Sequence, residues 1–304
     1  MNPYYKDYAE YLSEFFPDRK VQKISVNAGF SCPNRNGTIG RGGCIYCDNS
    51  SFTPSYCFET TGVRAQLEAG KRFFSRKYPN MNFLAYFQSF TNTFTDGVKD
   101  ISELERLYRE AMDAEGVAGL IIGSRPDCFS PAVVELLSAL NRELPLFVEL
   151  GAESSFNDTL RIINRGHTWN CTEDTAKRLS EAGLHVGLHL IAGLPGEDSD
   201  RLLTTIDRAC SLPIESLKLH HLQVIKDTDL HRKWESGEIE VKPYELEEYL
   251  NLCLKVVERV PRRIAIERFL ASSPPDKVVA PKWGIKNYEF TNRLLSLLKE
   301  KANV

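Results

Sequence analysis

Short apolar segments recur along the chain at intervals of roughly 30 to 35 residues, the length of a strand followed by a helix. They predict strands over residues 23–28, 83–87, 119–122, 146–150, 186–191 and 217–222. Between them, amphipathic segments predict helices over residues 63–77, 101–115, 131–142, 172–182 and 199–212. This alternation of strand and helix is typical of a parallel sheet covered by helices.

The number of these units limits the fold. Six strand-helix units are too few for a closed eight-stranded barrel, so we predict an α/β fold, a partial (β/α)6 barrel, over residues 20–228. Residues 1–19 form an N-terminal extension. In residues 229–304 the pattern changes to a charged helix over 244–259 and a last helix from about 288, which predicts a C-terminal extension packed on the barrel. We expect the loops at the carboxyl ends of the strands to carry the chemistry.

Composition narrows the functional class. The 304 residues are 42% hydrophobic and 26% charged, as in an ordinary globular protein. The net charge of −3 argues against a chain that binds nucleic acid over its whole surface, although a local basic patch is compatible with it. We expect no membrane segment, because no run of about 18 apolar residues occurs, and the N-terminus has no signal-peptide pattern.

Three cysteines on one glycine-rich loop carry the most chemical information. Cys32, Cys44 and Cys47 follow the first predicted strand. Three thiolates can bind three irons of a [4Fe-4S] cluster and leave the fourth iron open to a ligand. A structural zinc site is an alternative, but zinc takes four ligands, and with no histidine before His167 only Cys57 could complete the set. An unliganded, reduced set is a third interpretation.

The other cysteines are scattered, and we interpret them as small buried hydrophobic residues. They are Cys57, Cys128, Cys171, Cys210 and Cys253. Scattered thiols and an iron-sulfur cluster both favour a reducing, cytoplasmic location.

Several segments together resemble one enzyme superfamily. The loop of Cys32 to Cys47, the turn Ser124-Arg125-Pro126-Asp127 and the segments 149–154 and 164–168 resemble radical S-adenosylmethionine (SAM) enzymes of the YhcC-like group. They are also similar to the radical domain of the Elongator catalytic subunit, whose cysteine spacing is likewise wider than the usual one. The resemblance covers about residues 20 to 274. No acetyltransferase domain follows in the sequence, so we expect no acetyl transfer.

The resemblance implies a cofactor chemistry. The open iron of a [4Fe-4S] cluster binds SAM, and an electron from the cluster cleaves it to a 5′-deoxyadenosyl radical. A reductase, or a flavodoxin or ferredoxin, supplies the electron. The resemblance implies the radical SAM type of partial barrel for the fold. It does not specify an oligomeric state.

The resemblance also assigns residues to SAM. Tyr46 lies against the adenine, and Thr91, Asn92 and Thr93 assist the backbone in holding the methionine amino group, where the superfamily has a glycine-glycine turn. Ser124 belongs to the Arg-Pro-Asp turn, in which a local salt bridge between Arg125 and Asp127 is the simpler interpretation. Glu153 or Ser154 meets the ribose hydroxyls, and Arg165 binds the methionine carboxylate through its guanidinium fork. The segment from His189 to Gly193 passes the adenosyl group, although an ordinary strand-to-helix turn would also explain Gly193.

Two further residues follow from the strand pattern. Glu149 lies within an apolar strand, where an unpaired carboxylate is costly, so it needs a cationic partner, and Lys218 is the expected one. Alternation along the sixth strand places Lys218 and His220 on one face and His221 on the other.

The implied substrate is a nucleoside side chain in tRNA, at the wobble uridine. Radical chemistry on a small metabolite or a porphyrin-like substrate, and a non-catalytic carrier on the same fold, are the alternatives. A tRNA substrate needs a basic, aromatic mouth to hold an extruded base. The basic candidates are Lys71, Arg72, Arg76, Lys77, Arg262, Arg263 and Arg268. A solvated helix face would explain the same basic runs.

Overall fold

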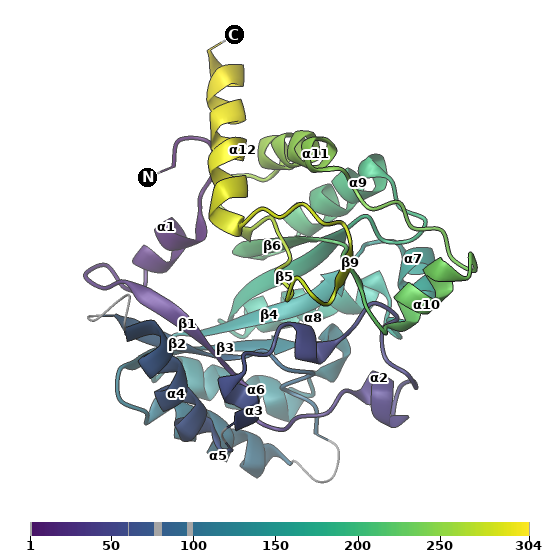
Figure 1. Cartoon of the computed structure of the whole chain (residues 1–304). Helices are drawn as coiled ribbons and strands as arrows, with labels where there is room; N and C mark the ends of the chain where they lie inside the picture. Colours follow the sequence, from purple (N-terminus) through teal and green to yellow (C-terminus); the bar gives the residue numbers. More distant parts are fainter. Residues whose placement is uncertain (1, 60, 76–80, 96–99, 304) are drawn as a thin grey trace.

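A seven-stranded sheet forms the centre of the protein (Figure 1). The structure is a computed structural model that describes residues 2–59, 61–75, 81–95 and 100–303. Neighbouring strands all pair in parallel, in the order β1-β2-β3-β4-β5-β6-β8. The strands are β1 (Val21–Val26), β2 (Asn82–Phe87), β3 (Val117–Ser124), β4 (Leu146–Glu153), β5 (His185–Ala192), β6 (Ser216–His221) and β8 (Ala265–Arg268).

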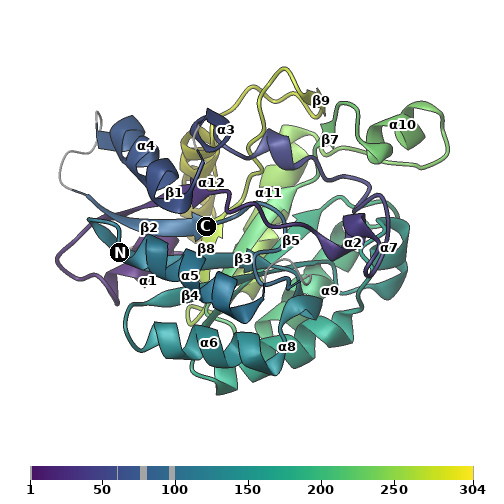
Figure 2. The same ribbon diagram turned by 90° about the horizontal axis from the view of Figure 1, so that it is seen from below.

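Helices cover the outer face of this curled sheet (Figures 1 and 2). They are α4 (Val63–Ser75), α5 (Ile101–Met112), α6 (Pro131–Asn141), α8 (Trp169–Glu181), α9 (Ser199–Cys210) and α11 (Leu246–Arg259). The outward residues of the strands, such as Leu120, Ile122, Leu188 and Leu190, are fully buried beneath them. The predicted α/β partial barrel is thus confirmed, as are the six predicted strands.

One strand comes from the segment predicted as the C-terminal extension. β8 pairs with β6 and becomes the seventh strand of the half-barrel. Its four residues, Ala-Ile-Glu-Arg, carry two charges, so their apolar signal is too short to predict a strand. The C-terminal region therefore contributes to the barrel wall as well as packing on it.

The remaining elements lie at the ends of the barrel and around it. They are the helices α1 (Tyr8–Ser13), α2 (Pro33–Asn36), α3 (Tyr56–Glu59), α7 (Asn157–Ile162), α10 (Asp229–Glu235) and α12 (Asn287–Ala302), the single turns η1 (Asn49–Ser51) and η2 (Pro126–Cys128), and the antiparallel pair β7 (Val224–Ile225) and β9 (Val278–Ala280). No helix among the described residues is long and apolar enough to cross a membrane.

The N-terminal helix α1 closes one end of the half-barrel. Tyr11 and Phe16 pack against inward-facing side chains of the sheet, among them Leu84, Ile121 and Phe147. The rings of Tyr11 and Phe147 meet edge to face with centroids 5.9 Å apart. Because this apolar plug fills the amino-terminal end of the barrel, the interior is left open toward the carboxyl ends of the strands.

Candidate functional site

The interior above the α1 plug is a cavity of about 390 Å³. Alternate residues of the strands line it, as the pleat of a strand requires: Glu149, Gly151 and Glu153 on β4, and Lys218 and His220 on β6. His221 points the other way and stacks on Trp283, with ring centroids 4.3 Å apart. The predicted division between His220 and His221 is therefore confirmed.

The loop after β1 brings the three predicted cysteines to the rim of this cavity. Cys32 caps the short helix α2, and the chain then turns back through Gly42 and Gly43, both in the left-handed region at φ +82° and +84°. A side chain at Gly43 would also place its Cβ 2.8 Å from Nε of Arg35. Glycine is therefore required where the loop reverses toward Cys44 and Cys47.

The three cysteines fit an iron-sulfur cluster better than a zinc ion. No three His, Cys, Asp or Glu side chains of the described ranges converge on one point, as a single metal ion requires. In a cluster each thiolate binds a different iron. Cys57, which the zinc alternative needs, does not line the cavity, and its thiol lies 3.3 Å from the carbonyl oxygen of Ser25.

Arg165 lies beside the cysteines in a fixed position. Its Nη1 is 3.4 Å from Sγ of Cys44, and its Nη2 donates to the carbonyl of Gly151 at 2.6 Å and lies 3.3 Å from Glu153. A Cβ at Gly151 would lie 2.6 Å from Nη2, so glycine makes room for the guanidinium. Burial alone would lower the pKa of Arg165, but Cys44, Tyr46 and Glu153 raise it well above its usual value. This permanently charged fork can bind a carboxylate.

The Arg-Pro-Asp turn supports Arg165 from behind. Arg125 forms the expected local salt bridge, with Nη2 2.7 Å from Oδ2 of Asp127. The same nitrogen donates to the carbonyl of Arg165 at 2.7 Å. Nη1 of Arg125 is buried, faces no hydrogen-bond partner among the described residues, and belongs to a side chain that lines the cavity.

The structure brings six of the residues assigned to SAM to the cavity and leaves four outside its lining. Tyr46, Thr91, Ser124, Glu153, Arg165 and His189 line it. Their individual roles stay predictions.

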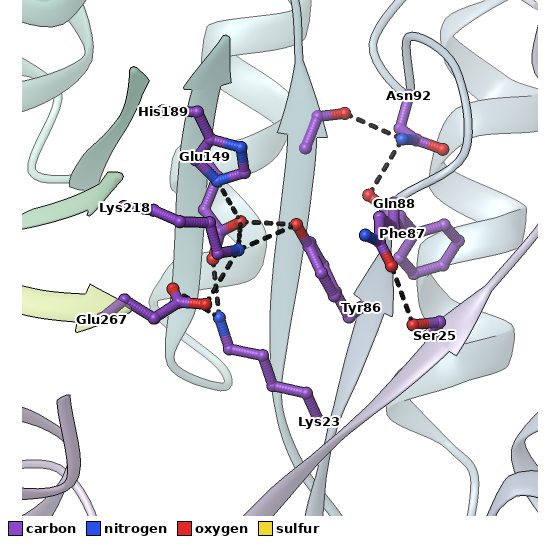
Figure 3. Close-up of polar contacts among 11 residues, drawn as sticks. Lys23, Ser25, Tyr86, Phe87, Gln88, Asn92, Glu149, His189, Lys218 and Glu267 are labelled. Carbon is purple, nitrogen blue, oxygen red and sulfur yellow. Dashed lines mark hydrogen bonds and ion pairs between the residues drawn. The ribbon is translucent and has the colours of Figure 1, made fainter. Parts of the chain in front are cut away.

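The four remaining residues brace the loops. Asn92 donates to the carbonyls of Phe87 and Gly123 at 2.9 and 2.8 Å (Figure 3). The hydroxyl groups of Thr93 and Ser124 are hydrogen-bonded, with their oxygens 2.6 Å apart. Ser154 is hydrogen-bonded to Glu197, and Gly193 lies against the ring of Tyr244 in a separate hollow. These four residues therefore do not line the cavity, and their roles toward SAM stay predictions.

Four charged side chains form a closed ring at the bottom of the cavity (Figure 3). Lys23 lies 2.7 Å from both Glu149 and Glu267, and Lys218 lies 2.9 Å from Glu149 and 2.8 Å from Glu267. We call these four residues the floor ring. The predicted Glu149–Lys218 pair is confirmed, whereas Lys23 and Glu267 were not predicted. Lys23 lies on a predicted strand that also carries other polar residues, and Glu267 lies on β8, which was not predicted as a strand, so neither had the clear signal that identified Glu149.

Two more groups bind Glu149. Its Oε2 accepts from the hydroxyl of Tyr86 at 2.6 Å and lies 2.6 Å from Nε2 of His189. Burial would raise the pKa of Glu149, but Lys218, Lys23 and His189 lower it well below its usual value. Burial lowers the pKa of Lys218, although Glu149 and Glu267 oppose the effect. The carboxylate of Glu149 therefore stays ionised at the centre of the network.

Most of the basic residues expected at the mouth lie elsewhere. Arg262 and Arg263 precede β8, at the edge opposite the cavity, where Arg262 pairs with Glu10 at 3.0 Å and Arg263 donates to backbone carbonyls. Their prediction as mouth residues was wrong, because the direction of β8 decides which of its ends faces the cavity. Arg268, at the other end of β8, does line the cavity. Arg76 and Lys77 lie outside the described residues, and Lys71 pairs with Glu68 on α4.

Comparison with known families identifies this arrangement. Residues 32–209 match the model of the radical SAM superfamily, and residues 214–300 match a radical SAM C-terminal domain. The chain belongs to the radical SAM superfamily. It is therefore an enzyme that uses a [4Fe-4S] cluster and SAM, and it needs a source of electrons.

Individual relatives agree with this assignment. This radical SAM enzyme is 34% identical to protein YhcC of Escherichia coli over 87% of this chain and 83% of that protein. It is 28% identical to the tRNA uridine(34) acetyltransferase of Methanocaldococcus jannaschii over 59% of this chain, which is only 33% of the relative. The solved structure of Methanocaldococcus infernus Elp3, lacking residues 1–46, shares the fold, with a TM-score of 0.67 and 19% identity over 93% of this chain and 64% of that one.

The cofactors fit the residues present. Cys32, Cys44 and Cys47 would hold the cluster, and Arg165, Glu153 and Tyr46 surround the space beside it. Once bound, cluster and SAM together supply a carbon radical able to remove a hydrogen atom from a substrate. The strands of the half-barrel and the floor ring surround the inner part of the cavity, where that chemistry would take place.

Proposed function

We propose that this radical SAM enzyme modifies a nucleoside side chain in tRNA, at the wobble uridine. Similarity to a tRNA uridine(34) acetyltransferase supports a nucleoside substrate. The observation that carries the proposal is the aromatic mouth of the cavity, formed by Phe52 and Phe90. Both side chains line the cavity, yet both remain 37% exposed.

The two rings are held at the mouth by their backbone. Phe90 lies in the left-handed region at φ +62°, a costly conformation for a bulky residue that persists only where the surroundings enforce it. Its N–H donates to Oδ1 of Asn49 at 3.3 Å, and the hydroxyl oxygens of neighbouring Ser89 and Thr53 are 3.1 Å apart. The segments that carry Phe52 and Phe90 are thus bonded to each other. Exposed aromatic rings fixed in this way suit the stacking of a base that has been turned out of an RNA loop.

Charge and size agree with a base at the mouth. Arg35 and Arg268 line the cavity, and their guanidinium groups donate to neutral acceptors, the carbonyl of Cys47 at 2.7 Å and the hydroxyl of Ser272 at 2.9 Å. Such guanidinium groups suit the phosphates of a nucleic acid. At about 390 Å³ the cavity is near the lower end of ligand pockets, which span about 300–1,000 Å³, and SAM shares it. A tRNA would therefore place only the side chain of one nucleoside in this space.

Nucleoside mass spectrometry tests the proposal. Bulk tRNA from a strain that lacks the gene should accumulate an altered wobble uridine, and the wild-type gene should restore the normal nucleoside. Phe90→Ala should restore it poorly, because loss of base stacking costs about 1–3 kcal/mol per base. Tyr288→Ala is the matched control, since Tyr288 is 60% exposed on α12 and does not line the cavity.

A second measurement addresses binding. Affinity of the reconstituted enzyme for tRNA should fall steeply with salt, because phosphate contacts release counterions. Arg268→Glu should weaken this binding, whereas Arg262→Glu, at the opposite edge, should not. An unchanged tRNA nucleoside profile in the deletion strain, or equal loss of binding in both variants, would favour a small-molecule substrate.

A further inference from the structure

The Glu149–His189 pair connects the floor ring to the open part of the cavity. Glu149 on β4 and His189 on β5 come from adjacent strands, and Oε2 of Glu149 lies 2.6 Å from Nε2 of His189 (Figure 3). His189 lines the cavity, and its side chain is 21% exposed, whereas that of Glu149 is 3% exposed. The imidazole therefore lies between the buried carboxylate and the space where a substrate reacts.

The hydrogen bonds fix the tautomer of His189. An ionised carboxylate can only accept hydrogen bonds, and Oε2 of Glu149 already accepts from Tyr86 and Lys218. Nε2 of His189 must therefore carry a proton and donate it. In the neutral imidazole Nδ1 then has no proton, and the hydrogen bond that the described structure gives to the His189 ring is the one at Nε2.

The neighbouring groups cannot take its place. Each lysine of the floor ring is bound between two carboxylates, and Tyr86 is held by Glu149 and Lys218. Tyr8 of α1 lies beneath the ring, with Nζ of Lys23 4.4 Å from its ring centroid. Among the titratable groups that line the cavity together with His189 are Lys23, Tyr86, Glu149, Lys218, His220, Glu267 and Arg268.

His220 differs from His189 although their ring centroids are only 5.8 Å apart. Its Nε2 is buried and unpartnered in the described structure, and no carboxylate bonds it. In His189, in contrast, the Glu149 carboxylate is hydrogen-bonded to Nε2, which leaves Nδ1 for a substrate. A nitrogen of this kind is suited to accept a proton.

We propose that His189 is a general base that removes a proton from an N–H or O–H group of the substrate, and that Glu149 positions it. The substrate's heteroatom–hydrogen bond breaks, the electron pair stays on the heteroatom, and a bond forms between hydrogen and Nδ1. The resulting imidazolium faces the Glu149 carboxylate. The inference rests on the radical SAM assignment, and it uses the proposed tRNA substrate only for its assay.

Two substitutions separate this role from a structural one. The side-chain amide nitrogen of glutamine can occupy the place of Nε2, so His189→Gln still donates to Glu149 but has no basic nitrogen. If His189 only donated a hydrogen bond to Glu149, glutamine could replace it with little loss of tRNA conversion. A general base contributes about 10²–10⁴-fold, so His189→Gln should lower tRNA conversion at least about 100-fold while cluster content stays at the wild-type level.

His185→Gln is the matched control. His185 lies on the same strand and the same face, and its Nδ1 is 3.0 Å from Glu215, but it does not line the cavity. This variant should convert tRNA within about threefold of wild type. Conversion is measured as the restored nucleoside in tRNA from the deletion strain, incubated with SAM and a reductant.

The tautomer of His189 can be measured independently of tRNA conversion. Nitrogen NMR of the reconstituted, oxidised protein labelled at its six histidines should show His189 with a proton on Nε2 and none on Nδ1, assigned by the signals missing in His189→Gln. A proton on Nδ1 of the neutral ring, or at least half of wild-type conversion by His189→Gln, would overturn the inference. If the proposed function is wrong, the wild-type enzyme itself will leave the tRNA unchanged. The NMR measurement does not use tRNA, so it still tests the tautomer of His189 in that case.

Discussion

The two ends of the cavity are built in opposite ways. At the rim, Cys32, Cys44 and Cys47 lie within sixteen residues on a single loop that reverses through glycines in the left-handed region. At the bottom, Lys23, Glu149, Lys218 and Glu267 lie on four strands spread over most of the chain. The rim is a local motif, whereas the floor ring exists only after the sheet has formed.

This difference assigns different tasks to the two ends. The cysteine loop is hydrogen-bonded to distant segments, through Asn164 to the carbonyls of Arg41 and Gly43 and through Ile45 to Ile163, but the loop is not part of the seven-stranded sheet. A ring of buried charges cannot be altered one residue at a time, because removal of one partner leaves the others unpaired in a medium that solvates them poorly. The rim therefore suits the binding of a cofactor, and the floor ring gives the cavity a rigid and polar base.

The largest expected effect is at the rim. Cys32→Ala, Cys44→Ala or Cys47→Ala should each abolish the [4Fe-4S] cluster, because an open-iron cluster has three protein thiolates and no spare one. Iron, sulfide and electron paramagnetic resonance after anaerobic reconstitution measure the loss. Cys57→Ser, which keeps a donor near the carbonyl of Ser25, should retain the cluster. Cluster loss in Cys57→Ser, or stoichiometric zinc in the purified protein, would contradict this assignment.

The next effect is at the floor ring. Glu149→Ala should lower the free energy of unfolding of the cluster-free protein by about 3–5 kcal/mol, because Lys23 and Lys218 remain buried beside an empty position. Urea unfolding measures it. Glu247→Ala, which removes an exposed partner of Arg293, should leave the unfolding midpoint unchanged. If the cysteine variants destabilised the protein as much as Glu149→Ala does, the contrast between the two ends would not hold.

A smaller effect is expected at Arg165, whose side chain contacts Cys44 at the rim and Glu153 on β4. Arg165→Ala should weaken SAM binding about tenfold or more, since a charge-assisted contact to a carboxylate contributes ~1.5–3 kcal/mol. The cluster content should not change. Anaerobic calorimetry with SAM measures the affinity, and Arg293→Ala on α12 serves as the exposed arginine control. Equal affinities for wild type and Arg165→Ala would remove this residue from the SAM site.

The smallest effect lies on the outer face of β6, directly behind the ring. Burial, with a further contribution from Arg268, lowers the pKa of His221 to about 3. An unfolded histidine titrates near 6.5, so between these values the unfolded state binds more protons and stability falls as pH falls. Lowering the pH from 7 to 5 should cost roughly 1–2 kcal/mol for this residue.

His221→Phe tests that slope. The difference in unfolding free energy between pH 7 and pH 5 should shrink in the variant by that amount, whatever its absolute stability. Burial and Arg165 lower the pKa of His167 to about 3. His167 therefore adds a similar pH dependence to the unfolding free energy, and His221→Phe leaves that contribution unchanged. A slope unchanged by His221→Phe would mean that His221 binds protons equally in the folded and unfolded states, which would contradict the lowered pKa.

Much of the fold and part of the site could be predicted from the sequence. The strands and helices follow from periods of two and 3.6 residues, which are local properties. The cysteine loop is contiguous, and the position of Glu149 in an apolar strand implied a cation such as Lys218. The sequence also placed His220 and His221 on opposite faces, because alternation is fixed within a strand.

Tertiary structure decided the rest. That α1 plugs the barrel, that β8 completes its wall and that Arg268 rather than Arg262 faces the cavity all depend on strand order and direction. The closure of the floor ring through Lys23 and Glu267 depends on register between strands far apart in the chain, and a shift of one residue would turn each side chain to the other face. Local patterns set which residues are strand, loop and ligand, whereas only long-range pairing sets which of them meet.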